Sequence, residues 1–127
     1  ERAAALGATA LEPGDRLPRR VDAVVETVGR ATWAHSAASV RPGGTIAVAG
    51  ATTGDADAAQ LTRIFFQEIR VQGVTMGSRD DLAALLAFLG THDLRPTIAL
   101  EVPLTDTARG IGLMAEGTHF GKVVVLP

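Results

Sequence analysis

Short runs of β-branched and aliphatic residues alternate with helical segments along this chain, and this alternation constrains the fold more than any other feature. We predict strands at residues 8–11, 21–26, 45–50, 70–76, 97–100 and 122–126. The run Val21–Glu26 is apolar on both faces, which is typical of a central parallel strand covered by helices on each side. Strands that alternate with helices of about ten residues favour an α/β fold with a doubly wound parallel sheet.

The segments between the strands carry recognisable helix signals. Thr32 is placed to cap a helix that runs to about Val40, and the Arg-Pro-Gly-Gly sequence after Val40 would end it. Ser78 and Asp81 have the spacing of a helix start, and leucines follow them at helical intervals. Apolar spacing indicates two further helices, around residues 61–65 and from about 105 to 117.

Composition narrows the class of protein further. The chain has 127 residues with 46% hydrophobic and 20% charged side chains, which fits one globular domain. Its formal net charge of −2 and the absence of basic runs argue against binding to nucleic acid or to an anionic membrane surface. No apolar stretch approaches the roughly 20 residues of a transmembrane helix, so we expect a cytoplasmic protein. Without cysteine it has no disulfide and no thiolate zinc site.

Small residues follow three of the predicted strands. The loops are Thr27-Val28-Gly29, Gly50-Ala51-Thr52-Thr53-Gly54 and Gly77-Ser78. In doubly wound sheets ligands bind beyond the carboxyl ends of the strands, and small residues there allow a flat cofactor to approach the backbone. We therefore predict a cofactor or ligand site at this edge.

Other patterns carry no chemistry of their own. Gly110 to Ala115 matches G-x-G-x-x-A, but it lies inside a predicted helix, so we interpret its glycines as packing positions. The three histidines are not spaced as metal ligands. The Asp80-Asp81 pair is better explained by the positive end of a helix dipole than by acid/base catalysis. We predict no catalytic residue and no metal ligand in the chain.

Several strings, read in order, resemble the medium-chain dehydrogenase/reductase superfamily, which includes zinc-type alcohol dehydrogenases and quinone oxidoreductases. They are ERAAALGA at 1–8, VDAVVETVG at 21–29, VRPGGTIAVAG at 40–50, GVTMGSRDDL at 73–82 and GKVVVL at 121–126. The resemblance implies an incomplete Rossmann fold that lacks its first strands. Residues 1–127 would form a single partial nucleotide-binding domain, and residues 97–127 would return toward a missing catalytic domain.

The resemblance also implies a set of coenzyme-binding residues. Thr27, Val28 and Gly29 would lie along the adenosine and its ribose, and Gly50, Ala51 and Thr52 would flank the nicotinamide ribose. Met76, Gly77 and Ser78 would reach the carboxamide through backbone groups. Either Arg79 or Lys122 could take the part of the basic side chain that some family members place near the pyrophosphate.

The implied coenzyme is NAD or NADP, with NADP the favoured of the two, and zinc would be held only by a domain upstream of Glu1. The strand at Val71 to Thr75 would pair with its mate in a homodimer. The implied reaction is hydride transfer between nicotinamide and an alcohol/carbonyl pair acting as a small-molecule substrate.

Three alternatives remain at this point. The chain could come from a quinone or enone reductase of the same superfamily without zinc, or it could be a dimerising nucleotide-binding module without catalysis. A third alternative is an unrelated doubly wound domain of the flavodoxin or response-regulator kind. If the chain comes from the superfamily, we expect the 127 residues alone to be inactive.

Overall fold

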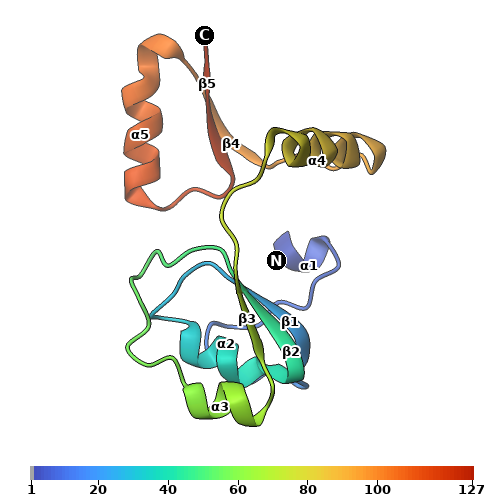
Figure 1. Ribbon diagram of the computed structural model, residues 1–127. Helices are drawn as coiled ribbons and strands as arrows, with labels where there is room; N and C mark the ends of the chain where they lie inside the picture. Colours follow the sequence, from blue (N-terminus) through green and yellow to red (C-terminus); the bar gives the residue numbers. More distant parts are fainter. Residues whose placement is uncertain (1) are drawn as a thin grey trace. The chain divides into compact units, whose positions relative to one another are not determined.

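The computed structural model describes residues 2–127, and the chain divides into two compact units. The first unit runs to Met76 and the second from Gly77 to Pro127. Both are α/β units in which every strand pairing is parallel (Figure 1). The predicted α/β fold class with parallel sheets is therefore confirmed.

The first unit contains a parallel sheet in the order β1-β2-β3. Its elements are α1 (Arg2–Ala5), β1 (Val21–Glu26), α2 (Trp33–Ser39), β2 (Val40–Val48), α3 (Leu61–Phe66) and β3 (Arg70–Gly73). The core lies where the helices pack on the sheet, and its buried members are Trp33, Ala37, Val40, Ile46 and Ile69. The sheet thus has one well-packed face in this unit.

The second unit contains a two-stranded parallel sheet with helices. Its elements are α4 (Arg79–Thr91), β4 (Ile98–Pro103), the short 3₁₀ helix η1 (Leu104–Asp106), α5 (Thr107–Glu116) and β5 (Lys122–Leu126). Helix α5 packs on the sheet through Gly110, where an added Cβ would lie 2.8 Å from Cγ1 of Val123. This close approach confirms the packing interpretation of Gly110, whereas Gly112 has open space around it.

Helix α4 begins as predicted. The Ser78 hydroxyl accepts a hydrogen bond from the Asp81 amide at 3.1 Å, and the Asp81 carboxylate accepts from the Ser78 amide at 2.8 Å. This reciprocal pair is a capping box, and it accounts for Asp81 without any acid/base role. The side chains of Leu82, Leu85 and Leu86 on this helix are more than half exposed.

Several sequence predictions were wrong in detail. Residues 8–11 form no strand, and among the described residues no neighbouring segment pairs with them. The Arg-Pro-Gly-Gly stretch lies inside β2, whose register with β1 is irregular there, so strand rather than loop follows α2 directly. Strand β1 lies at the edge of the described sheet rather than at its centre, and Val25 is 74% exposed.

Candidate functional site

The carboxyl ends of the three strands in the first unit lie at one edge of the sheet. Glu26 at the end of β1 is in register with Val48 of β2, and Val48 is in register with Gly73 of β3. The segments that follow these strands therefore leave the sheet side by side. This edge is where ligands bind in open parallel sheets.

The buried carboxylate of Glu26 organises the first of these segments. Glu26 is 2% exposed, and its Oε1 accepts hydrogen bonds from the Val28 amide at 2.8 Å and the Gly29 amide at 3.0 Å. The Thr32 hydroxyl donates to the same oxygen at 2.7 Å, and the Ser36 hydroxyl donates to Oε2. One side chain thus ties β1, the loop and helix α2 together.

These donors keep the carboxylate ionised. Burial alone would raise the pKa of Glu26, but the hydrogen bonds from Ser36, Gly29, Thr32 and Val28 outweigh it and lower the pKa from 4.5 to about 2. At neutral pH the loop after β1 therefore folds around a fixed negative charge. Thr32 stands at the N-cap position directly before α2 as predicted, but its hydroxyl donates to Glu26 instead of capping the helix.

Two glycines allow the loops after β1 and β2 to touch. Gly29 has a φ of +89°, and a Cβ there would lie 2.4 Å from the Gly54 carbonyl oxygen and 2.9 Å from Cα of Ala51. A Cβ on Gly50 would lie 3.0 Å from the Thr27 carbonyl oxygen. Gly29 therefore requires glycine, because its φ is positive and backbone occupies the space of a side chain, whereas Gly50 is a tight position against the backbone of Thr27.

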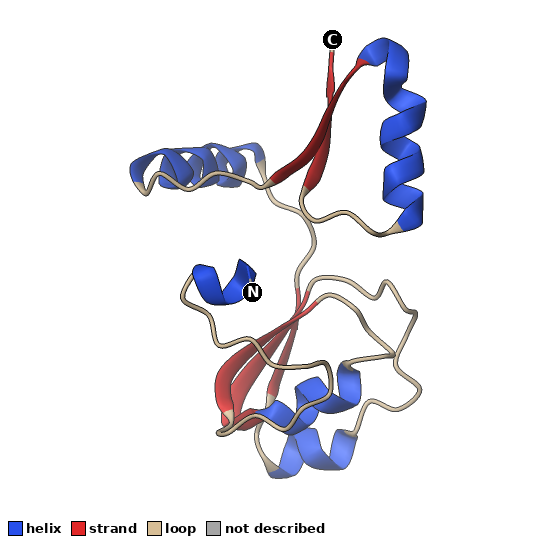
Figure 2. Cartoon of the chain, turned by 180° about the vertical axis from the view of Figure 1, so that it is seen from behind, coloured by secondary structure: helices blue, strands red, loops and turns tan. Residues whose placement is uncertain are grey.

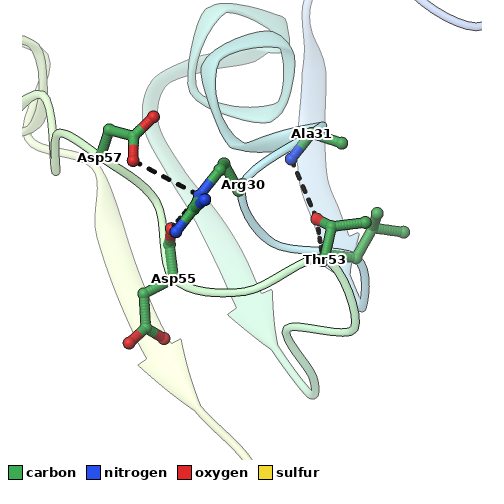
Figure 3. A network of polar contacts seen from close by, with 6 residues as sticks. Arg30, Ala31, Thr53, Asp55 and Asp57 are labelled. Atoms are coloured by element: carbon green, nitrogen blue, oxygen red, sulfur yellow. Dashed lines mark hydrogen bonds and ion pairs between the residues drawn. The ribbon is translucent and has the colours of Figure 1, made fainter.

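A polar network holds the two loops together (Figure 3). The Thr53 hydroxyl donates to the Val28 carbonyl at 2.7 Å and accepts from the Ala31 amide at 3.0 Å. Arg30 donates from Nε to the Asp55 carbonyl at 3.0 Å and approaches the Asp57 carboxylate at 3.4 Å. The edge is therefore a pre-formed surface of two interlocked loops.

The structure brings together some of the predicted coenzyme residues. Thr27, Val28 and Gly29 lie against Gly50 and Ala51, through the contacts just described. Thr52, next in the chain, is exposed. Further along, Met76 closes the first unit with a 99% exposed side chain, whereas Gly77 and Ser78 belong to the second unit. The coenzyme role of all nine residues stays a prediction.

Sequence reasoning missed Glu26, and it included Thr53 in a candidate loop without giving it a role. A signal for Glu26 was present: Thr32 and Ser36 lie four residues apart on one helix face, directly after a glycine loop that follows a strand ending in glutamate. Such a pair of hydroxyls facing a carboxylate predicts a buried hydrogen-bonded anion. Thr53 had no such signal, because its partners come from a different loop.

The described residues hold no metal-binding cluster. Across residues 2–127, no three His, Cys, Asp or Glu side chains come close enough to share an ion. His35 bonds the Asp15 carbonyl and His92 bonds the Phe88 carbonyl within its own helix turn. In the same part of the chain, no helix is both long and apolar enough to cross a membrane.

The parallel sheet of the first unit, with interlocked loops at its carboxyl edge, has the arrangement of a Rossmann-type fold. A sequence profile described as zinc-binding dehydrogenase matches residues 6–125. The chain belongs to this family of oxidoreductases.

Proteins similar to this chain include alcohol dehydrogenases and an alcohol dehydrogenase-like protein. The chain is 28% identical over 109 residues to the zinc-type alcohol dehydrogenase-like protein YogA of Leptosphaeria maculans, a match that covers 83% of this chain and 30% of that protein. An NAD-dependent alcohol dehydrogenase structure is 30% identical with a TM-score of 0.76, covering 86% of this chain and 32% of the other. A cobalt- and zinc-bound thermostable alcohol dehydrogenase from Pyrobaculum aerophilum is 28% identical with a TM-score of 0.74. This match covers 86% of this chain and 33% of that structure's chain. The chain thus spans about a third of the length of these relatives.

Proposed function

We propose that this chain is the coenzyme-binding part of an NAD(P)-dependent, zinc-type alcohol dehydrogenase-like enzyme that works in the cytoplasm. The observation that carries the proposal is the pair of interlocked loops at the carboxyl edge of the sheet, in a chain of the zinc-binding dehydrogenase family. The reaction would be hydride transfer between a nicotinamide and an alcohol/carbonyl pair. Zinc, where the enzyme uses it, would be bound by a catalytic domain and not by residues 1–127.

The residues at this edge fit a dinucleotide. The hydroxyls of Thr27 and Thr52 are exposed and have no protein partner among residues 2–127, so both are free to bond ribose hydroxyls. The small side chain of Ala51 leaves room for a flat ring near the backbone. Nicotinamide supplies the hydride chemistry when bound, and these residues would hold and orient the sugars on either side of it.

Glu26 and Thr53 would stabilise the conformation of the loop after β1 and would not bind the coenzyme themselves. Glu26 fixes the amides of Val28 and Gly29, and Thr53 fixes the Val28 carbonyl. These groups are already bonded within the protein, so they are not available to a ligand. Their part is to hold the loop surface in one conformation before the coenzyme arrives, which lowers the entropic cost of binding.

A bulky side chain at the exposed loop tests the proposal. Thr52→Trp should weaken NADH and NADPH binding at least tenfold, whereas Thr118→Trp, an exposed position in the second unit, should leave both unchanged. Titration followed by isothermal calorimetry gives the dissociation constants, and the ratio of the two constants tests the preference for NADP. Equal affinities of wild type and Thr52→Trp would contradict a coenzyme site at this loop.

We also propose that β3 forms a homodimer contact through residues 71–75. β3 is an edge strand of the described sheet; Val71 within it is 44% exposed, and Val74 directly after it is 50% exposed. An unpaired strand edge with apolar side chains favours pairing with a second copy. Light scattering should show Val71→Lys as a monomer and Ile111→Lys, on the exposed face of α5, as the unchanged dimer. A dimer that survives Val71→Lys would place the interface elsewhere.

A further inference from the structure

A cavity of about 380 Å³ in the first unit is lined by an unusual set of basic side chains. Arg16, Arg19 and Arg20 come from the loop between α1 and β1, His35 from α2 and Arg63 from α3. Figure 2 shows the long loop that joins α1 to β1. The cavity therefore forms where this loop meets the two helices that cover the sheet.

The cavity is positively charged, whereas the whole chain has a net negative charge. Four of the 12 lysine and arginine residues line this one cavity, in a chain of net charge −2. No aspartate or glutamate lines it. The nearby carboxylate of Asp22 bonds Arg41 at 2.6 Å, and its pKa is lowered first by that bond and to a lesser extent by the charge of Arg19. Positive charge is thus concentrated at the cavity with little internal compensation.

The arginines are largely without anionic partners. In the described part of the chain, the guanidinium groups of Arg16 and Arg63 have neither an ion pair nor a hydrogen-bond partner. Arg20 donates from Nη1 to the neutral Gln67 side chain at 3.0 Å. By contrast, four other arginines of the chain are paired with aspartates. Guanidinium groups without carboxylate partners are free to bind an outside anion.

The wall of the cavity is held in place by backbone bonds. His35 bonds the Asp15 carbonyl at 2.8 Å, and the Asp15 amide bonds the Glu12 carbonyl at 3.1 Å. A second hollow, of about 430 Å³, adjoins the cavity through the shared residues Gly14, Leu17 and His35, and Glu12 and Asp15 are among its lining residues. The acidic side chains of the loop thus line the adjoining hollow, and the hydrogen bond between His35 and Asp15 ties this part of the loop to α2.

We propose that the arginine-lined cavity binds the phosphate group of a small molecule. The planar guanidinium offers several donors in a fork that matches phosphate oxygens, and several arginines can share one multiply charged group. The cavity lies at the amino end of β1, where Arg19 and Arg20 directly precede Val21. The six residues of β1 span about 20 Å, so this site is distinct from the loops at the opposite edge.

Calorimetric titration of the 127-residue chain tests the proposal. The probes are inorganic phosphate, pyrophosphate and glycerol 3-phosphate, at constant ionic strength with chloride as the control anion. Wild type should bind at least one probe saturably, and the order of affinity distinguishes the free ion from a phosphate ester. Arg16→Gln with Arg63→Gln should weaken that binding by about tenfold for each arginine removed.

The matched control is Arg95→Gln with Arg109→Gln, which removes the same charge from the second unit, where both arginines pair with aspartates. It should leave the affinity within about twofold of wild type, because distant surface charges are screened by salt. Equal weakening in both double variants would overturn the proposal, as would the absence of saturable binding to all three probes.

Amide NMR shifts of the wild-type chain give a second readout that needs no variant. Pyrophosphate should move the amide resonances of Gly14, Arg16, Leu17, Arg19, Arg20, His35 and Arg63. Shifts confined to residues 27–29 and 50–54 would overturn the second site and would indicate that the anion occupies the proposed coenzyme edge instead. Failure of the coenzyme proposal alone would leave the first set of shifts unchanged.

Discussion

Replacing Glu26 by glutamine should destabilise the first unit in a pH-dependent way. The change keeps the shape of the side chain but removes the charge that accepts hydrogen bonds from Val28, Gly29, Thr32 and Ser36. The pKa of Glu26 falls from 4.5 to about 2, and each unit of pKa is worth about 1.4 kcal/mol. The ionised form therefore contributes about 3 kcal/mol to the stability of the folded state at neutral pH.

The sign of the pH dependence follows from the lowered pKa. The contribution is fully present above the unfolded value of 4.5, and it is lost as the pH falls toward the folded value of about 2. Glu26→Gln should therefore lose about 3 kcal/mol at pH 7 and progressively less below pH 4.5. At pH 2 the wild type is half protonated, and the two proteins should differ little.

Urea unfolding followed by tryptophan fluorescence measures the difference in stability between wild type and Glu26→Gln, because the probe lies in the same structural unit as Glu26. Trp33 is the single tryptophan of the chain and lies in the core of the first unit. Glu101→Gln, at an exposed position of β4, is the matched control and should change stability by less than about 0.5 kcal/mol. A Glu26→Gln loss below about 1 kcal/mol at pH 7, or one that is equal at pH 7 and pH 3, would refute the reasoning.

Three further predictions concern packing, capping and catalysis. Gly110→Ala should lower the melting temperature, because its Cβ would lie 2.8 Å from Val123, while Gly112→Ala, with open space around it, should raise helix stability by about 0.5–1 kcal/mol; calorimetry compares the two. Ser78→Ala should reduce the helical circular dichroism of α4, because the capping box with Asp81 is lost, whereas an unchanged spectrum would contradict it. The purified 127-residue chain should not oxidise NADH or NADPH with carbonyl substrates, and measurable turnover would show that the chain holds its own catalytic groups.

Local signals in the sequence predicted much of the fold. Helix α4 follows from the spacing of Ser78 and Asp81, and β1 from a dense β-branched run, because both depend on residues close together in the chain. Residues 8–11 were predicted as a strand and are not one, since a strand also needs a neighbour to pair with. Periodicity alone carries no information about that neighbour.

Some parts of the candidate site could also be predicted from local sequence signals, and others could not. The strand-end loops at Gly29 and Gly50 were predicted from small residues in a parallel sheet, and the structure places them in contact. The burial of Glu26 depends on donors within ten residues, so the spacing of Thr32 and Ser36 could have revealed it. The basic cavity could not have been found, because Arg63 lies more than forty residues from Arg20 and only the fold brings them together.

One measurement tests the central claim most directly: amide NMR of the 127-residue chain during titration with NADH and with NADPH. The account predicts saturable shifts at Thr27, Val28 and Gly29 and at Gly50, Ala51 and Thr52, and smaller changes along the rest of the first unit. The absence of shifts at millimolar coenzyme, or saturable shifts that avoid both loops, would contradict a coenzyme site at this edge of the sheet.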